Sequence, residues 1–187
     1  MKTVFEKEKN SFAELKGKFG HKNSMSSPRL IKIVVSAGVG SLIKKDRTKG
    51  DLVIDRLSKI TGQRPASRGA KKAISTFKTR IGDIVGYVVT LRGRRMYSFL
   101  DKLLNVALPR TKDFRGISRG AVDTVGNLSI GIKEHNIFPE AASEELKDLF
   151  GFSITLVSTA KTKDEALAFF ELLGVPFKKS EEGKGKK

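Results

Sequence analysis

Apolar and polar positions at the start of the chain predict a helix followed by a strand. Phe12, Leu15 and Phe19 fall on one helical face with polar residues between them. Gly20 follows as a stop signal, so residues 1–20 are expected to form an amphipathic helix that packs on the body of the protein. The β-branched run at 29–36 predicts a strand that ends in a tight turn at A-G-V-G.

The middle of the chain predicts a second helix and a pair of strands. Residues 51–60 carry apolar side chains at helical spacing, and Gly62 closes the segment. Two alternating apolar runs, at 74–77 and 84–91, are typical of strands. The turn signal at 82–83 between them predicts that these strands are antiparallel.

The last part of the chain predicts two more helices, two more strands and a long loop. Helical periodicity marks 94–107 and 163–173, and Gly174 ends the second of these helices. Strand patterns mark 128–132 and 152–159. The polar, glycine-rich segment between the third helix and these strands, 111–127, is too long for an idle connection and is therefore a candidate contact loop.

Composition excludes several classes of protein. With 187 residues, 39% of them hydrophobic, and 12 Phe, the chain can bury a core, which excludes wholesale disorder. The absence of Cys excludes disulfide scaffolds, thiolate zinc sites and cysteine nucleophiles, and only two His argue against a metal centre. No apolar run reaches the roughly 18 residues of a membrane helix, and charges interrupt the start where a signal peptide is apolar. A cytosolic protein without cofactor or membrane partner is expected.

Charge points to a polyphosphate partner. The 37 Lys and Arg outnumber the 20 Asp and Glu, a formal net charge of +17. Between Lys59 and Arg95 only Asp83 is acidic, and residues 64–80 contain no acid at all. A solubilising surface normally mixes the two signs, whereas a one-sided basic surface neutralises phosphates and releases their counterions. The final residues, 180–187, are polar and predict a disordered basic tail.

The residue types favour folded RNA over other partners. Aromatic residues are 7% of the chain and Trp is absent, so the strands lack the stacking residues that bind unpaired bases. The helices are separated by strands, which argues against a helix-turn-helix that binds DNA. The turn Gly38-Val39-Gly40 lacks the third glycine of a dinucleotide fingerprint, and no catalytic constellation is visible, so an enzyme is not expected.

Two basic stretches are candidate contact sites. Around Arg68 to Lys72, small residues between the cations let the backbone approach a phosphate chain and predict a flexible basic hairpin tip. Arg92, Arg94 and Arg95 lie at a junction between a strand and a helix, where guanidiniums can make bidentate phosphate contacts. Ordinary charge at a helix end is the alternative for this second stretch.

Seven motifs, in order, resemble the large-subunit ribosomal protein L-five family of bacterial type. The likeness covers roughly residues 1–179. It implies a single α+β domain in which helices flank an antiparallel sheet. It also implies a structural protein of the large subunit that binds 5S rRNA and helps attach it in the central protuberance. The motifs are V-V-S-A-G-V-G, T-G-Q-R-P, A-K-K-A-I-S-T-F-K-T-R, V-T-L-R-G, P-R-T-K-D-F-R-G, I-F-P-E and T-A-K-T.

The resemblance assigns residues to three contact surfaces. Ser36 stands where the family usually has Asn, and a hydroxyl is shorter than an amide. The implied rRNA-binding residues are Ser36, Gln63, Arg64, Arg80, Thr90, Arg92 and Arg94. The loop implied to reach P-site tRNA contains Arg68, Lys71, Lys72 and Lys78. The implied intersubunit bridge to small-subunit protein S-thirteen contains Arg110, Lys112, Asp113, Phe114, Arg115 and Arg119.

The resemblance implies further partners, and the residues alone leave other functions open. The resemblance implies contacts with 23S rRNA and with other proteins of the central protuberance. A general basic RNA-binding protein or RNA chaperone is the main alternative. Two further alternatives are an RNA-modifying or nucleotide-using enzyme and a membrane-surface protein held by charge alone. Salt dependence separates these classes, because a binder held by charge alone loses affinity on every nucleic acid alike.

Overall fold

The computed structural model describes residues 3–46, 48–112, 114–141 and 149–178, which form an α+β fold. Five antiparallel strands make one sheet in the order β2-β3-β1-β5-β4. The expected fold class is therefore confirmed. The strands are β1 (Leu30–Gly38), β2 (Ala66–Gly69), β3 (Ile84–Leu91), β4 (Leu128–Ile132) and β5 (Phe152–Ser158). The α-helices of the described residues are α1 (Val4–Phe19), α2 (Gly40–Lys45), α3 (Thr48–Thr61), α4 (Gly93–Lys102) and α5 (Lys163–Leu173).

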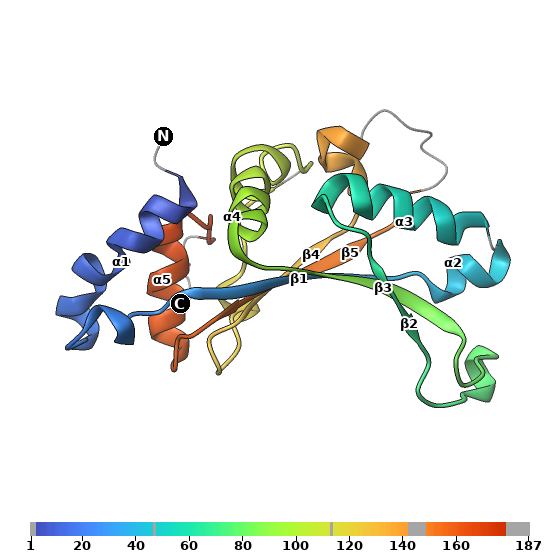
Figure 1. The fold of residues 1–187 in the computed structure, drawn as a ribbon, viewed down its shortest axis with the longest axis horizontal. Coiled ribbons are helices and arrows are strands. Elements are labelled where there is room, and N and C mark those ends of the chain that lie inside the picture. Colours follow the sequence, from blue (N-terminus) through green and yellow to red (C-terminus); the bar gives the residue numbers. More distant parts are fainter. Residues whose placement is uncertain (1–2, 47, 113, 142–148, 179–187) are drawn as a thin grey trace, which may run out of the picture.

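The helices and the sheet share one hydrophobic core. In Figure 1, α3 and α4 lie over one face of the sheet, and α1 and α5 pack side by side near one end of it. Ile33 of β1 and Leu91 of β3 are fully buried, as are Leu57 of α3 and Leu100 of α4. Each such side chain contributes roughly 1.5–3 kcal/mol of hydrophobic free energy. Burial on this one face holds the sheet in a fixed register.

Most of the elements expected from the sequence are present. The first helix ends at Gly20, whose φ of 67° is left-handed, and the strand patterns at 84–91 and 128–132 match β3 and β4. The third helix is regular only to Lys102 and continues as a π-helical turn at Leu103–Ala107. The chain after the G-x-G turn forms the short helix α2, which the sequence patterns did not predict.

The strand expected at 74–77 is wrong. Ser75–Phe77 is a single 3₁₀ turn, and the neighbour of β3 is instead β2, with Ala66 opposite Val88. The apolar side chains that suggested a strand are exposed. Phe77, for example, retains 69% of its accessible surface. Alternation of apolar residues therefore marked the tip of a hairpin here, where no second layer exists to bury them.

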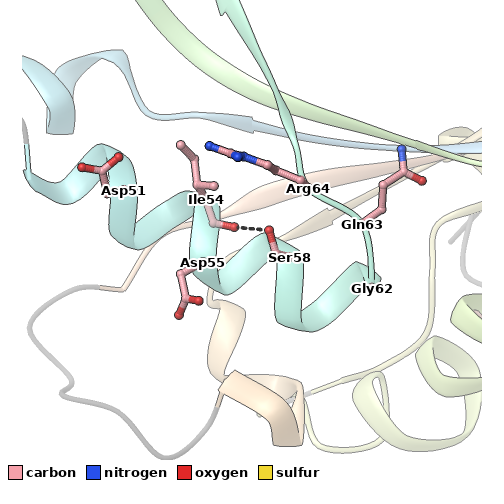
Figure 2. A pocket seen from close by; sticks show the side chains of 7 residues that line it. All are labelled: Asp51, Ile54, Asp55, Ser58, Gly62, Gln63 and Arg64. Carbon is pink, nitrogen blue, oxygen red and sulfur yellow. Dashed lines mark hydrogen bonds between the residues drawn. The ribbon is translucent and has the colours of Figure 1, made fainter.

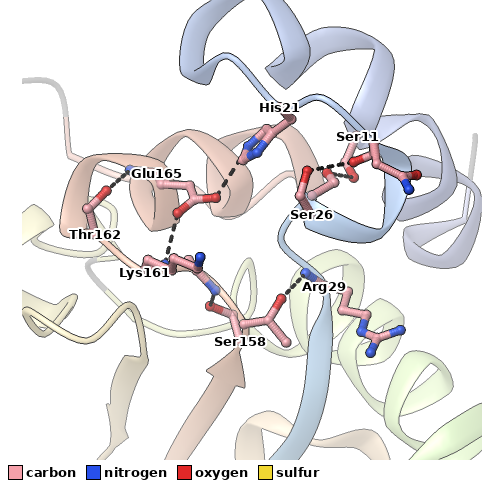
Figure 3. Close-up of polar contacts among 12 residues, drawn as sticks. Ser11, His21, Ser26, Arg29, Ser158, Lys161, Thr162 and Glu165 are labelled. Carbon is pink, nitrogen blue, oxygen red and sulfur yellow. Dashed lines mark hydrogen bonds and ion pairs between the residues drawn. The ribbon is translucent and has the colours of Figure 1, made fainter.

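Polar contacts fasten the segment after α1 to the first turn of α5 (Figure 3). His21 Nε2 lies 3.3 Å from Glu165 Oε1, and the Lys161 backbone N–H donates to Glu165 Oε2 at 2.9 Å. The Arg29 backbone N–H donates to Thr159 Oγ1 at 2.9 Å. Glu165 is only 7% exposed, so its contacts with His21 and with the Lys161 N–H offset the cost of burying its carboxylate.

Close approach of β1 and β3 requires a glycine at one position. A Cβ built on Gly86 would lie 2.5 Å from the Ala37 carbonyl oxygen, closer than any real Cβ contact. Gly38 is directly opposite Gly86 in the register, yet a Cβ there would meet nothing within 4 Å. The two paired glycines therefore differ in what the fold demands of them.

Gly86→Ala should lower the free energy of unfolding by about 2 kcal/mol or more, because the new methyl group overlaps backbone that cannot move without disturbing the β1–β3 ladder. The matched control, Gly38→Ala, should change it by less than about 0.5 kcal/mol. Urea unfolding followed by circular dichroism measures both values. Equal stabilities of the two variants would show that the close approach is not a constraint.

Candidate nucleic-acid interface

One face of the sheet carries side chains that the core does not use. Alternate residues of each strand point away from the buried face, and their side chains are half-buried or exposed. We call this surface the open face. It comprises Lys32, Val34 and Ser36 on β1, Val88 and Thr90 on β3, Ser153, Thr155 and Val157 on β5, and Ser129 and Gly131 on β4. None of these residues is acidic.

Hydroxyl groups form short rows across the open face. Ser36 is paired in the register with Ser153 on one side and with Val88 on the other. The hydroxyl oxygens of Ser36 and Ser153 lie 2.8 Å apart, and those of Ser129 and Thr155 lie 3.3 Å apart. Side chains this small leave the sheet surface low, with hydrogen-bonding groups at its level.

Cations lie at the margin of the open face. Arg92 is exposed and immediately follows β3, one position beyond the pair formed by Ile33 and Leu91. Continuation of that register brings Arg92 opposite Lys32. Arg94 is exposed in the first turn of α4, where backbone N–H groups and the helix dipole also favour an anion. Within the described residues neither guanidinium forms an ion pair, so both are available to phosphates.

Gln63 and Arg64 belong to the connection that leaves α3. Gln63 is half-buried, and its carbonyl accepts a hydrogen bond from Thr61 Oγ1 at 3.0 Å. Figure 2 shows the Arg64 side chain running back toward Ile54, while Gln63 points away from it. The shallow groove beside them, about 490 Å³, is also lined by carboxylates. Asp55 is paired with Lys59 at 2.7 Å, but the carboxylate of Asp51 repels a phosphate chain, so the groove is a poor site for an RNA backbone.

The hairpin between β2 and β3, residues 70–83, extends away from the body (Figure 1). Its cations Lys71, Lys72 and Lys78 are exposed, as is Arg68 on β2. Arg80 is also exposed and lies in this hairpin, so the structure does not group it with Ser36 and Thr90 on the sheet. The tip is therefore a basic surface separate from the open face.

A lysine from α2 holds the tip of this hairpin. Lys44 Nζ donates to the Lys78 carbonyl at 3.0 Å and to Thr79 Oγ1 at 2.6 Å. Lys78 has a φ of 49°, a left-handed conformation that is uncommon for a residue with a side chain. The same Nζ also donates to the Phe77 carbonyl at 2.5 Å, so Lys44 satisfies two carbonyls of this turn.

The glycine-rich segment is tied to the fold at its centre. The Ile117 N–H donates to the Pro176 carbonyl at 2.8 Å, and the Lys178 N–H donates back to Ile117 at 2.9 Å. Arg119 pairs with Glu171 of α5 at 2.7 Å, and Phe114 packs on the core. Besides Arg119, the exposed cations in the segment or directly before it are Arg110, Lys112 and Arg115, whereas Asp113 lies outside the described residues.

Other kinds of site find little support. His135 is buried and stacks on Phe150 with ring centroids 4.4 Å apart, and this burial, with the nearby charge of Arg56, lowers its pKa. In the part of the chain that the structure describes, no three His, Asp or Glu side chains gather as metal ligands would. No described helix combines the length and apolarity needed to cross a membrane.

Sequence reasoning missed part of the open face. Ser129, Ser153 and Thr155 lie there beside Ser36, but they were not among the expected site residues. The signal was the alternation F-S-I-T-L-V-S, in which Ser153 and Thr155 separate large apolar residues. The role of Lys44 could not have been found this way, because its contacts join segments more than 30 residues apart.

Two family models match consecutive parts of the chain. The model described as Ribosomal protein L5 matches residues 23–80, and the model for the C-terminus of that family matches residues 84–177. The large ribosomal subunit protein uL5 of Desulforamulus reducens is 47% identical over 162 residues, which are 87% of this chain and 89% of the relative. The uL5 proteins of Ureaplasma parvum and a Thermoanaerobacter species are each 45% identical over 172 residues, covering 91% and 92% of this chain and 93% and 96% of the relatives.

Lys44→Met should loosen the hairpin tip, because the methionine keeps the stem but cannot donate to the tip. We expect roughly fivefold faster exchange of the Lys78 and Thr79 amide hydrogens, as the loss of about 1 kcal/mol of hydrogen bonding implies. Hydrogen–deuterium exchange measures this. Lys45→Met, at the next residue, has the same loss of charge and should leave the tip unchanged; the same exchange rates in both variants would contradict the anchoring role.

Proposed function

Because the chain belongs to the ribosomal protein L5 family, it is a structural, non-enzymatic constituent of the large ribosomal subunit, and we propose that it binds 5S rRNA there. The binding helps to attach this RNA in the central protuberance. The observation that carries the proposal is the open face, which is low, rich in hydroxyl groups, free of acidic residues and bordered by cations.

The two kinds of side chain on this face and beside it, where Gln63 and Arg94 lie, have different roles. Arg92 and Arg94 neutralise phosphates and so supply affinity that depends on salt. Ser36, Thr90 and Gln63 form hydrogen bonds whose geometry suits one RNA shape. A-form RNA has a wide, shallow minor groove, and a flat sheet surface can lie against it more closely than against the deep major groove. Arg64 is exposed, and it would add a phosphate contact beside Gln63 once its side chain turns away from Ile54.

The hairpin of residues 70–83 is proposed to contact P-site tRNA. The hairpin extends away from the body and its cations, like Arg68, are exposed, so they can reach an RNA different from the one on the sheet. The anchored turn at Lys78 supports this role because it presents the charges from a defined position. Arg80 fits this surface by location, and any contact it makes with 5S rRNA would come from the base of the hairpin.

The glycine-rich segment is proposed to form an intersubunit bridge to protein S-thirteen. The exposed cations there are Arg110, Lys112 and Arg115. The backbone hydrogen bonds of Ile117 fix the segment to the chain near Phe177. Arg119 is engaged with Glu171, so its contribution would require exchanging that partner. Contacts with 23S rRNA and with neighbouring proteins of the central protuberance complete the proposed set of partners.

Gln63→Ala and Thr90→Val should each lower affinity for 5S rRNA by about 1–3 kcal/mol, because each removes a directed hydrogen bond. Competition by tRNA and by a random hairpin across a salt titration gives the preference of each variant. Ser98→Ala removes an exposed hydroxyl that bonds only within α4, so it should bind like the parent. A uniform loss on all three RNAs would favour the alternative, a general basic RNA-binding protein or RNA chaperone.

The double change Lys71→Glu and Lys72→Glu should weaken binding to tRNA at least tenfold while 5S rRNA binding falls by less than about threefold, because these charges lie on the hairpin and not at the open face. Lys18→Glu with Lys22→Glu alters net charge equally on another exposed surface and serves as the control. Fluorescence anisotropy with each RNA measures the affinities. Parallel losses on both RNAs would show that the two surfaces are not separate.

A further inference from the structure

A small cavity lies between the first helix and the chain that follows it. Its volume is about 180 Å³, and it is lined by residues of α1 and of the segment 24–29. In Figure 1, α1 is at the opposite end of the molecule from the hairpin of residues 70–83. The match to the first family model begins at residue 23, after α1. We call this cavity the α1 pocket.

Apolar side chains at the α1 pocket stand apart from the hydrophobic core. Met25 is 79% exposed and Phe5 is 45% exposed. Phe5 packs edge-on against Tyr97, with ring centroids 5.1 Å apart. The core cluster of the described residues includes neither Phe5 nor Met25, and it does not include Phe12, which also lines the pocket. Exposed apolar side chains gathered around a hollow are typical of an interaction site.

A carboxylate at the α1 pocket has one oxygen without a partner. The Tyr97 hydroxyl donates to Glu8 Oε1 at 3.0 Å. Glu8 Oε2 is buried and accepts no hydrogen bond within the part of the chain that the structure describes. Burial raises the pKa of this carboxyl, and the Tyr97 hydroxyl, the Leu30 backbone and the charge of Arg29 offset the effect only in part. An unpaired buried oxygen is costly, so a donor from outside the chain would be stabilising there.

Two buried serines line the same pocket. Ser11 is 2% exposed and Ser27 is 7% exposed. Their hydroxyl oxygens lie 3.4 Å apart, which is longer than the roughly 2.5–3.0 Å of an ordinary O–H···O hydrogen bond. Both oxygens therefore retain acceptor capacity that the fold uses poorly. With Glu8, they make the pocket a group of acceptors that calls for a ligand rich in donors.

Size and charge favour an arginine side chain as this ligand. The pocket is smaller than the roughly 300–1,000 Å³ of small-molecule sites, so it suits a single side chain. The Glu8 carboxylate repels a phosphate, and a neutral donor would leave its charge uncompensated. A guanidinium supplies a positive charge and five donors and is only weakly hydrated. Lys9 does not fill this role, because its Nζ lies over the Phe5 ring, 4.6 Å from the centroid.

We propose that the α1 pocket binds an arginine side chain of a neighbouring protein, with Glu8 paired to the guanidinium and Met25 packed on the aliphatic stem. The exposed thioether of Met25 is flexible enough to move aside for entry. The inference goes beyond the proposed RNA contacts, because α1 contributes no residue to the open face, the hairpin or the glycine-rich segment. It adds a protein contact at the end of the molecule where α1 lies.

Peptide binding to the full chain tests the pocket with defined probes. One probe is an acetylated and amidated leucine–arginine–leucine tripeptide, and the other has citrulline, a neutral side chain of the same shape, in place of arginine. The methyl signal of Met25 in a nuclear magnetic resonance titration should shift saturably with the arginine peptide. The citrulline peptide should bind about tenfold more weakly, because it lacks the charge. Equal binding of the two peptides, or no shift with either, would overturn the proposal.

Glu8→Gln removes the charge but keeps an acceptor for the Tyr97 hydroxyl. The variant should bind the arginine peptide about tenfold more weakly, with a melting temperature within a few degrees of the parent. Glu14→Gln makes the same change of charge at an exposed position of α1, and it should bind the peptide as the parent does. If both variants bind the peptide like the parent, Glu8 is not the partner of the guanidinium and the assignment is wrong.

A photo-crosslinking residue in place of Met25 distinguishes a protein occupant from RNA in assembled large subunits. The expected product joins position 25 to an arginine-containing segment of another subunit protein, and changing that arginine to glutamine should remove the product. Crosslinks to rRNA alone, or none, would contradict the proposal. Affinity for 5S rRNA should be equal in Glu8→Gln and the parent, and a loss in the variant would also contradict it. A parent protein without preference for 5S rRNA would overturn the proposed function and leave this inference standing.

Discussion

The position of β1 in the centre of the antiparallel sheet is the constraint on which the rest of the structure depends. Because β1 pairs with β3 on one side and β5 on the other, its alternating side chains set which residues of all three strands share a face. Ile33 and Val35 join the core on one face, so Ser36 must lie on the other. A slip of one residue would bury the hydroxyls and expose the apolar residues.

Acidic and basic side chains are also separated: carboxylates are paired within the body, and the open face carries none. Several carboxylates are engaged within the body: Glu165 with His21, Glu171 with Arg119, and Glu140 with Lys102 at 2.8 Å. The residues of the open face include no acid, and the cations at its margin are exposed. The Glu165 contact is buried, whereas the other two pairs are partly exposed and add little stability. All three carboxylates lie away from the surface where phosphates are proposed to bind.

Local patterns predicted the elements well where burial follows the pattern. The alternation in 84–91 and the helical spacing in 163–173 both correspond to faces buried in the core. The same reasoning failed at 74–77, since Ile74 and Phe77 are exposed at a hairpin tip. Ser36 and Thr90 could be proposed from the sequence through its family resemblance, but their neighbour Ser153 depends on strand pairing across 117 residues. Pairing between distant strands is a tertiary property that local periodicity does not contain.

The most direct test of the account is to ask which face of the sheet touches 5S rRNA. In a deuterated protein with labelled methyl groups, saturation transferred from bound RNA should weaken the signals of Val34, Val88 and Val157 on the open face. The exposed Val106, beside α4 on the helical side, should keep its signal. Loss of the Val106 signal with the open-face methyl groups unaffected would contradict the central claim that the sheet surface is the RNA-binding face.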